Sequence, residues 1–595
     1  MRARVPVVLG VTVAIAAIAH AALALRSLAP WIVPDELIYS EIAKSLGDGS
    51  PPKVRDEVTF EWGLGYPALL APIWAVVDDV ERAYAVAKAW NALILASTAI
   101  PAYMLARRFT SEGHALVAAA LSVSIPPMLY AGTLMTEVAL YPAFVLAVWA
   151  IARAVEAPST RTQLVALGVV GLACMVKSLS SVLIAALVAA IVLYHALDRG
   201  RAGESFPKRL RPYAVTWVAV AASVVVASGA LLIAGSRPQD ALGTYANVLE
   251  HMQPSEVPRW IVLHLAELDL ALAVIPLAAA AVVSVRGIRG DGTQQERLYV
   301  SVVVPVVTLW LVAVGAFASV PFLESFGYPE NVDRLQGRST FMLAPLFFIG
   351  LVMWLRDRRG SLVVVAGITA AAALLPALIP LGNFDRNVRF QALALVPWVE
   401  SRDEISWPAG VLFATVVLGV VFVATARIRA PAWLVILPIA TVFVVTAASA
   451  HVSMNFAAES SRNLSTGPDA TWIDRAVDGD VSVLWAEPPG MPFVDLASRQ
   501  RVLFVGEFFN RRVAGVYELG SRLPYNLPSE AVSLRGSRVV DADGRPVDAG
   551  ELVLVPCHVT VVGEPVVTNV AVGATVVRVE PPLRATVADP LTCAK

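Results

Sequence analysis

The sequence predicts a polytopic α-helical membrane protein with a β-rich domain at its C-terminal end. Hydrophobic residues make up 57% of the 595 positions and charged residues only 16%, which is unlike a soluble globular protein. Apolar runs long enough to cross the bilayer, about 20 residues each, recur from near residue 5 to near residue 450. After residue 451 the chain becomes more polar, and short β-branched runs replace the long ones.

The apolar runs divide into about thirteen membrane spans. The first follows a basic MRAR sequence, as a signal peptide would, but its length and the many later spans favour an uncleaved helix. The two short runs on either side of Lys177 are also compatible with a broken hairpin. We expect spans near 5–25, 83–106, 113–131, 134–155, 162–176, 179–197, 213–235, 258–285, 298–320, 339–355, 361–380, 408–426 and 431–450.

Positive charges gather in one set of the segments that connect these spans. Positive residues concentrate on the cytoplasmic side of membrane proteins, so we expect a multi-pass plasma-membrane protein with a cytoplasmic N-terminus. The loops of the opposite side, which are longer and more polar, are 26–82, 236–257, 321–338 and 381–407. The cytoplasmic set includes Arg2, Arg4, Arg107, Arg108, Arg153, Arg161, the cluster at 199–211, and the arginines at 286–297, 356–359 and 427–429.

The C-terminal part has the pattern of a small β-rich domain. We expect about eight strands within 452–595, outside the cytoplasm, and a transmembrane catalytic domain over 1–451. Cys557 and Cys593 both lie in this part, where they form either a disulfide or two separate thiols. The expected strands include VSVLW (481–485), RVLFVGEFF (501–509), AVSLRG (531–536), ELVLVP (551–556) and ATVVRVEP (574–581), with a turn at DADGRP (541–546).

The segment PDELIYSEIAKSLGDG, at 34–49, predicts an amphipathic helix on the outer membrane surface. Pro34 suits the first turn of a helix, and Asp35 and Glu36 suit the positive end of its dipole. Apolar side chains recur at every fourth position from Ile38. The two acids would lie at the level of the lipid headgroups, facing whatever approaches from outside. The alternative is that they merely cap the helix.

Five segments, taken in order, resemble the GT-C superfamily of membrane glycosyltransferases, in particular its protein O-mannosyltransferase and aminoarabinose transferase branch. The short motifs span most of residues 1–450, and their order and sidedness carry the resemblance. The segment around Arg338 is similar to that of actinobacterial members. The motifs are the Asp-Glu pair after the first helix, GLGYPALLAPIWAV (63–76), TLMTEVALYP (133–142), GLACMVKSLSSVLI (171–184) and VDRLQGRSTFMLAPLFF (332–348).

This resemblance implies an inverting transfer of a sugar, such as mannose or arabinose, from a polyprenyl-phosphate carrier. The acceptor would be a hydroxyl of an envelope glycan, lipid or protein on the extracytoplasmic face. A positioned carboxylate takes the proton of the acceptor as the new bond forms, and we assign this role to Asp35. Glu36 would orient the acceptor or pair with a cation. Glu137 would be a second acid across the cavity, or a helix cap.

The leaving phosphate needs cations at the membrane interface. Lys177, Arg334 and Arg338 are the candidates, because ammonium and guanidinium groups match phosphate oxygens. Each has an alternative role in an ion pair or as a side chain that reaches out of the apolar region. A lysine at the end of apolar segments is costly unless an anion meets it.

Tyr39, His264 and Glu267 are expected to line the same cavity, although a hydrogen-bonded structural histidine is the stronger interpretation of His264. No group of residues has zinc-site spacing, so we expect no metal or other cofactor, although some branches of the superfamily use a divalent cation. A net charge of -1 gives no indication of a nucleic-acid partner; the expected partners are the lipid-linked donor, the acceptor and membrane lipid.

Two other functions are compatible with a chain of this kind. A transporter or flippase of lipid-linked sugars would keep its charges near the midplane of the membrane and show two similar halves. A noncatalytic envelope scaffold would bind only through its C-terminal part. Convergence of Asp35, Glu137, Lys177 and Arg338 favours the enzyme, and scattered positions would favour the scaffold.

Overall fold

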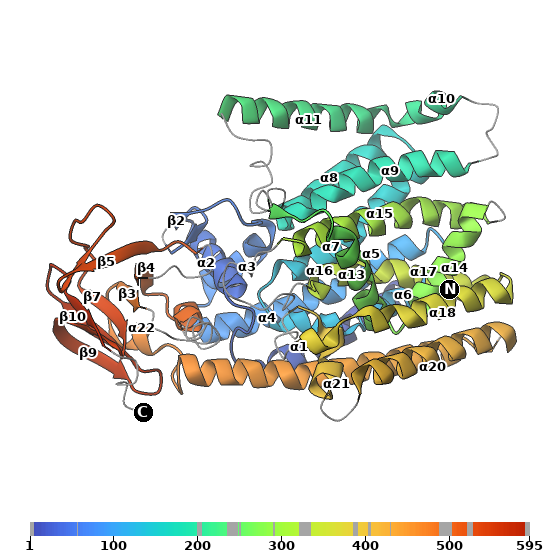
Figure 1. Cartoon of the computed structure of the whole chain (residues 1–595). Helices are drawn as coiled ribbons and strands as arrows, with labels where there is room; N and C mark the ends of the chain where they lie inside the picture. The colour runs from blue at the N-terminus through green and yellow to red at the C-terminus, as the bar shows by residue number, and fades with distance from the viewer. Residues whose placement is uncertain are drawn as a thin grey trace.

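The computed structural model is a bundle of long helices with a β-rich domain at one end (Figure 1). Among the described residues, eight helices are long and apolar enough to cross a membrane, or up to ten if each of two bent pairs forms one span. The expected number of thirteen stays a prediction. The structure describes residues 5–55, 57–198, 205–234, 248, 251–289, 292–320, 335–384, 391–402, 406–428, 430–486, 503–520 and 527–588.

Most expected spans correspond to helices. The buried side chains concentrate in α17, whereas α1 and α20 expose many apolar side chains, as helices in contact with lipid do. The helices of these spans are α1 (Val5–Ala24), α4 (Val80–Ser97) with α5 (Ala99–Ala106), α7 (Thr136–Glu156), α8 (Thr160–Val176), α9 (Val182–Leu197), α11 (Ala214–Ala234), α15 (Gln294–Ala318), α17 (Ala344–Asp357), α18 (Leu362–Leu374), α20 (Trp407–Ile428) and α21 (Trp433–Ser465).

Two expected spans are broken. The 113–131 span consists of α6 (Glu112–Ser122) and the 3-10 helix η2 (Pro126–Gly132), bent by 53°, because consecutive prolines supply no N–H groups to continue the first helix. The 258–285 span consists of α13 (Val257–Ala271) and α14 (Ile275–Arg289), which meet at 116°. Ala273 and Val274 adopt left-handed backbone conformations at this corner.

The β-rich domain contains a mixed seven-stranded sheet in the order β6-β5-β4-β3-β7-β10-β9, with β3 parallel to β4 and β7. A two-stranded sheet, β11-β8, accompanies it. The strands are β3 (Val481–Ala486), β4 (Val513–Leu519), β5 (Glu530–Arg535), β6 (Arg538–Val540), β7 (Leu552–Pro556), β8 (Val559–Val561), β9 (Gly563–Asn569), β10 (Ala574–Val579) and β11 (Ala585–Val587).

Two features of this region differ from expectation. The segment expected as a strand at 501–509 is helical over 503–509, because it packs Phe504 and Phe508, one helical turn apart, into the core. The expected division of the chain after residue 451 falls inside α21, which continues to Ser465. Cys593, the partner considered for Cys557, lies outside the described residues.

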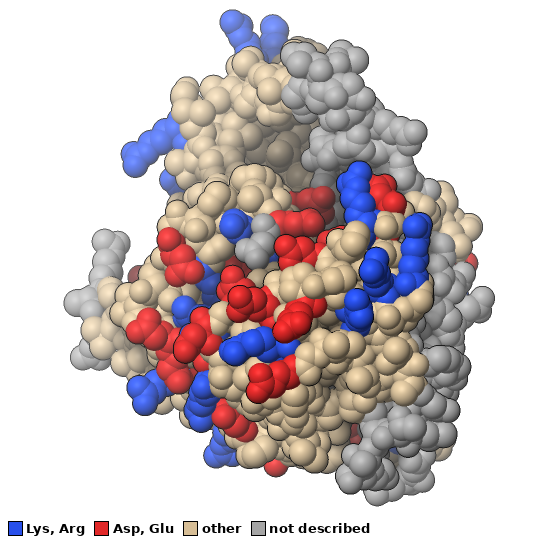
Figure 2. Space-filling model, turned by 90° about the vertical axis from the view of Figure 1, so that its left-hand side faces the viewer, with Lys and Arg blue, Asp and Glu red and all other residues tan. Residues whose placement is uncertain are grey.

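Charged side chains of both signs cover the face of the molecule that carries the sheet (Figure 2). Such a surface belongs in water, because charges exposed to hydrocarbon are costly. The C-terminal sheet therefore lies outside the lipid, at what we call the domain end of the bundle.

The predicted surface helix exists as α2 (Asp35–Gly47), but it is not an exposed amphipathic helix. Ser40 and Lys44 on its polar side are buried. The helix packs against α3 (Gly65–Val76), and Lys44 Nζ donates to the carbonyl oxygen of Phe508 at 3.1 Å. The C-terminal domain covers the side of α2 that the sequence suggested would face water.

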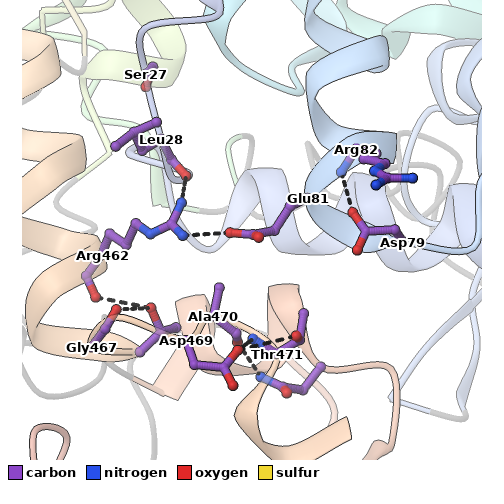
Figure 3. Close-up of polar contacts among 12 residues, drawn as sticks. Ser27, Leu28, Asp79, Glu81, Arg82, Arg462, Gly467, Asp469, Ala470 and Thr471 are labelled. Atoms are coloured by element: carbon purple, nitrogen blue, oxygen red, sulfur yellow. Dashed lines mark hydrogen bonds and ion pairs between the residues drawn. The ribbon is translucent and has the colours of Figure 1, made fainter. Parts of the chain in front are cut away.

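Ion pairs fasten the domain to the bundle. The Arg55 guanidinium makes two contacts of 2.8 Å with the Glu507 carboxylate, and both side chains are buried. Burial raises the pKa of the Glu507 carboxyl, and the positive charge of Arg55 acts in the opposite direction. A second connection is more exposed: Arg462 of α21 contacts Glu81 of α4 at 2.6 Å and the carbonyl oxygen of Leu28 at 3.4 Å (Figure 3).

Candidate active site

Four residues predicted from the sequence meet at the domain end of the bundle. Arg338 Nη1 lies 3.0 Å from Asp35 Oδ2, and Lys177 Nζ lies 2.7 Å from Glu137 Oε1. Arg338 Nε lies 4.0 Å from the same Glu137 oxygen, which joins the two pairs into one cluster. Among the four, Asp35 has the most exposed side chain, at 27%, whereas that of Glu137 is 2% exposed.

A break between two helices places Lys177 in this cluster. Lys177 ends α8 in an extended conformation, and the 3-10 helix η3 (Ser178–Ser181) follows before α9 begins. This is the broken hairpin that the two short apolar runs allowed. The break allows the Lys177 ammonium to reach Glu137, which lies in the first turn of α7.

Arg338 lies on a single helical turn, α16 (Gly337–Thr340). Hydrogen bonds to two other segments of the chain fix this turn. Its backbone N–H donates to the carbonyl oxygen of Gln391 at 2.7 Å. Two residues earlier, the N–H of Gln336 donates to His264 Nε2 at 2.9 Å, and His264 Nδ1 lies 2.6 Å from the carbonyl oxygen of Trp260. His264 therefore braces the turn that carries Arg338, which is the structural role weighed for it.

Glu267 lies beside the same turn. Its carboxylate is buried, and it approaches Gly337 so closely that a Cβ there would lie 2.5 Å from Oε1. Thr340 Oγ1 donates to Glu267 Oε2 at 3.4 Å. A side chain at position 337 would therefore displace the Glu267 carboxylate.

Tyr39 is also buried, with edge contacts to Trp62 and Tyr66 at 6.3 and 6.0 Å between ring centroids. It therefore packs among aromatic rings. Arg334, the remaining phosphate-binding candidate, lies outside the described residues.

Glu36 has a different place from the one expected. Its side chain points into the protein, where Oε1 accepts the N–H groups of Trp31 and Ile32, both at 2.9 Å. Oε2 accepts the N–H of Leu134 at 2.9 Å and the Tyr84 hydroxyl at 3.3 Å. Glu36 is fully buried, so it joins the segments before α2 and α7 and does not face an acceptor.

Burial raises the pKa of Glu36 to about 7, while the three backbone N–H groups and the charge of Lys88 act in the opposite direction. Lys88 of α4 also donates to the carbonyl oxygen of Ser27, and its ammonium lies 4.2 Å from the centre of the Tyr84 ring. The sequence analysis missed Tyr84 and Lys88. The sequence offered one indication of their importance: Lys88 is a lysine within an apolar helix.

Tyr130 is another residue that the sequence analysis missed. Its ring stacks between those of Trp31 and Phe341, at centroid distances of 6.1 and 5.9 Å. Its buried hydroxyl has no hydrogen-bond partner among the described residues and interacts electrostatically with Arg338 and Glu137. The break in the helix at the proline pair before Tyr130 could have drawn attention to it.

The arrangement combines one accessible carboxylate with two cations held by a buried acid. Such a site can accept a proton at Asp35 and stabilise negative charge at Arg338 and Lys177. Over the described parts of the chain, no three His, Cys, Asp or Glu side chains are grouped as metal ligands would be.

Comparison with known proteins finds one family model that matches part of the chain and solved structures that share its fold. Residues 64–228 match the family model described as dolichyl-phosphate-mannose-protein mannosyltransferase. The structure is similar to ArnT from Cupriavidus metallidurans bound to undecaprenyl phosphate, with 13% identity and a TM-score of 0.52, over 98% of each chain. Apo ArnT from the same organism gives 14% identity and a TM-score of 0.50, over 95% of this chain and 97% of that one.

An oligosaccharyltransferase from Archaeoglobus fulgidus matches more weakly, with 13% identity and a TM-score of 0.37, over 80% of this chain and 62% of that one. That likeness supports no inference. No curated protein sequence matches the chain. Together with the helices and the C-terminal sheet, the likeness to ArnT confirms the predicted fold, a GT-C-like multi-pass membrane protein with a β-rich C-terminal region.

Proposed function

We propose that this chain, which resembles the GT-C glycosyltransferases of the mannosyltransferase and aminoarabinose transferase branch, transfers a sugar from a polyprenyl-phosphate carrier to an acceptor hydroxyl. The observation that carries the proposal is the contact of 3.0 Å between Arg338 and Asp35, next to Lys177 and Glu137. In this proposal the cations meet the phosphate of the lipid-linked donor, and Asp35 meets the acceptor hydroxyl.

The reaction would be a single displacement at the anomeric carbon. The acceptor oxygen forms a bond to that carbon while its proton moves to Asp35. The bond from the carbon to the phosphate oxygen breaks, and the electron pair leaves with the polyprenyl phosphate. Arg338 and Lys177 stabilise the charge that develops on that leaving group. Attack from the side opposite the phosphate inverts the anomeric configuration.

Glu36 and Glu137 have supporting roles in this proposal. Glu36 fixes Asp35, its neighbour in the chain, against the segment that leads into α7. Glu137 holds Lys177 and Arg338 close together although both are positively charged. A phosphate that enters would compete with the two carboxylates for these cations.

We further propose that the domain end faces the outside of the cell and that the N-terminus is cytoplasmic. The arginines that end α5 and α7 lie at the other end of the bundle, as the positive-inside rule requires of a cytoplasmic face. The acceptor would then be an envelope glycan, lipid or protein that reaches the site beside the C-terminal domain. Thiol labelling of Asp48→Cys in intact cells tests this orientation, and labelling only after lysis would overturn it.

The test of the function is sugar transfer by Asp35→Asn in membranes supplied with a polyprenyl-phosphate sugar. Asparagine keeps an oxygen for Arg338 but cannot take a proton, so we expect the rate to fall by roughly 100- to 10,000-fold. Asp48→Asn, an exposed acid just after the same helix, is the matched control and should keep the wild-type rate. Normal turnover by Asp35→Asn would exclude Asp35 as the base.

A further inference from the structure

A cavity with arginines in its lining lies at the end of the bundle opposite the candidate active site. It has a volume of about 540 Å³, and residues of α5, α7 and α8 line it. Four arginines contribute to the lining: Arg107, Arg108, Arg153 and Arg161. Glu137 and Arg153 lie in the first and last turns of the same helix, α7, so at 1.5 Å per residue they are separated by roughly 24 Å along its axis. The two sites therefore lie near opposite surfaces of the membrane.

The positive charge of this cavity is only partly compensated. Arg108 pairs with Glu156, but its buried Nε has no hydrogen-bond partner among the described residues. The Arg107 guanidinium donates to the carbonyl oxygen of Thr110 at 2.7 Å, and it has no ion pair among the described residues. The side chains of Arg153 and Arg161 have no ion-pair or hydrogen-bond partner within the described chain. Among the described residues, the four guanidinium groups around this hollow thus form an ion pair with one carboxylate, that of Glu156.

Much of the remaining lining is apolar, and it continues onto the exposed apolar side of α8. Trp149 and Val165 contribute to it. Val165 is 41% exposed, and its neighbour Leu164 is 55% exposed on the apolar helix α8. A ligand that fits must combine an anionic group with an apolar part, because a soluble anion would leave the apolar lining unused.

We propose that this cavity binds the phosphate-bearing headgroup of an anionic membrane lipid. The phosphate contacts Arg153 and Arg161, and the acyl chains follow Val165 and Leu164 into the hydrocarbon. Guanidinium groups suit phosphate oxygens because each offers several N–H donors in one plane. Basic pockets between transmembrane helices are a known type of lipid site. The site does not depend on the proposed sugar transfer.

The experiment measures lipid binding to the purified full-length protein by native mass spectrometry, with phosphatidylglycerol and phosphatidylcholine as probes. The variant is Arg153→Gln with Arg161→Gln, which removes two charges. The control is Arg356→Gln, an exposed arginine at the end of α17 that does not line the cavity. Inorganic phosphate, added as a competitor, distinguishes a lipid site from a general anion site.

We expect phosphatidylglycerol to bind the wild type and Arg356→Gln with equal affinity. The double variant should bind it roughly 30-fold more weakly, from the loss of two positive charges near a membrane anion. Phosphatidylcholine should be little affected by any substitution. Equal binding of phosphatidylglycerol to all three proteins would overturn the proposal, and so would its complete displacement by millimolar phosphate.

Discussion

Arg338 Nη1 lies 3.0 Å from Asp35 Oδ2, although 303 positions separate the two residues in the sequence. The Nε of the same guanidinium is 4.0 Å from the buried Glu137 carboxylate. One cation thus lies between an accessible acid and a buried one. In the proposed reaction, a phosphate that takes over Arg338 would release Asp35 from its partner, and donor binding would then make the proposed base available.

The first prediction concerns the selective role of Arg338 in donor use. Arg338→Ala should raise the KM for the polyprenyl-phosphate sugar by roughly 10- to 100-fold, because a charge-assisted hydrogen bond contributes about 1.5–3 kcal/mol. The KM for the acceptor should change much less. Initial rates at varied donor and acceptor concentrations separate the two effects.

Arg338→Lys is the matched variant, because it keeps the charge without the planar group of donors, and it should restore part of the donor affinity. Arg259→Ala, an exposed arginine that pairs with Glu256, should leave both KM values unchanged. An unaltered donor KM in Arg338→Ala would make its contact with Asp35 a purely structural ion pair.

The second prediction is strong coupling between Lys177 and Glu137. Their contact is 2.7 Å, and the Glu137 side chain is nearly inaccessible. Removal of either charge alone leaves the other charge partly buried, which costs about 3–5 kcal/mol for a fully buried pair. Glu137→Gln and Lys177→Gln should each lower the thermal unfolding temperature in detergent.

The double variant should be destabilised by clearly less than the sum of the two single variants, since no unpaired charge remains. Arg338 limits this recovery, because it also interacts with Glu137. Purely additive effects on the free energy of unfolding would show that the two side chains do not act as a pair.

The sequence predicted which residues form this site better than it predicted which of them contact one another. Asp35, Glu137, Lys177 and Arg338 were identified because each stands where an apolar segment begins or ends, and ends of spans on one side of a membrane meet at the same level. Asp35 and Glu36 could not be told apart in this way. Their different roles depend on the direction of each side chain, which only the packing of α2 decides.

Other features depended on contacts that sequence patterns do not show. The sharp corner at Ala273 and Val274 contains no glycine that would have indicated it in the sequence. The helix at 503–509 has the aromatic and β-branched composition of a strand, and its burial against the bundle decides its conformation. The expectation of an exposed helix at 34–47 failed because the C-terminal domain, hundreds of residues away, covers it.

The third prediction tests Glu36 as a positioning residue. In Glu36→Gln, the amide nitrogen must replace an oxygen that now accepts the N–H of Leu134 or those of Trp31 and Ile32. Two donors would then face each other in a buried place, at a cost of about 1–3 kcal/mol for each group left unsatisfied. We expect a lower unfolding temperature and a reduced kcat.

Glu41→Gln is the control on the same helix, because Glu41 is part-exposed and its one ion pair within the described ranges is with nearby Lys44. It should alter stability by less than about 1 kcal/mol. A Glu36→Gln protein with wild-type stability but altered acceptor KM would instead place Glu36 against the substrate.

The fourth prediction concerns metal. Lys177 and Arg338 provide two positive charges beside the proposed phosphate position, which is the role that a divalent cation has in other phosphate sites. Sugar transfer should therefore be insensitive to EDTA in membranes washed free of loosely bound ions. Loss of activity in EDTA, with recovery on addition of Mg²⁺ or Mn²⁺, would show that Lys177 and Arg338 do not replace a divalent cation.

The last prediction compares two ion pairs that join distant parts of the chain. Arg55 and Glu507 form a two-point contact with side chains that are 3% and 5% exposed. Arg462 and Glu81 form one contact of 2.6 Å with side chains that are 21% and 38% exposed. Desolvation makes an unpaired charge expensive in the first case, whereas water and salt screen the second.

Arg55→Gln should therefore destabilise the docking of the C-terminal domain by about 3–5 kcal/mol, and Arg462→Gln by at most about 1 kcal/mol. Hydrogen exchange of the helix at 503–509 measures docking directly, and it should increase strongly only in Arg55→Gln. Because this helix packs over α2, which carries Asp35, the same variant should also lose transfer activity. Equal exchange in the two variants would mean that the Arg55 ion pair does not hold the domain in place and that other contacts, such as Phe508 against Tyr84, do so.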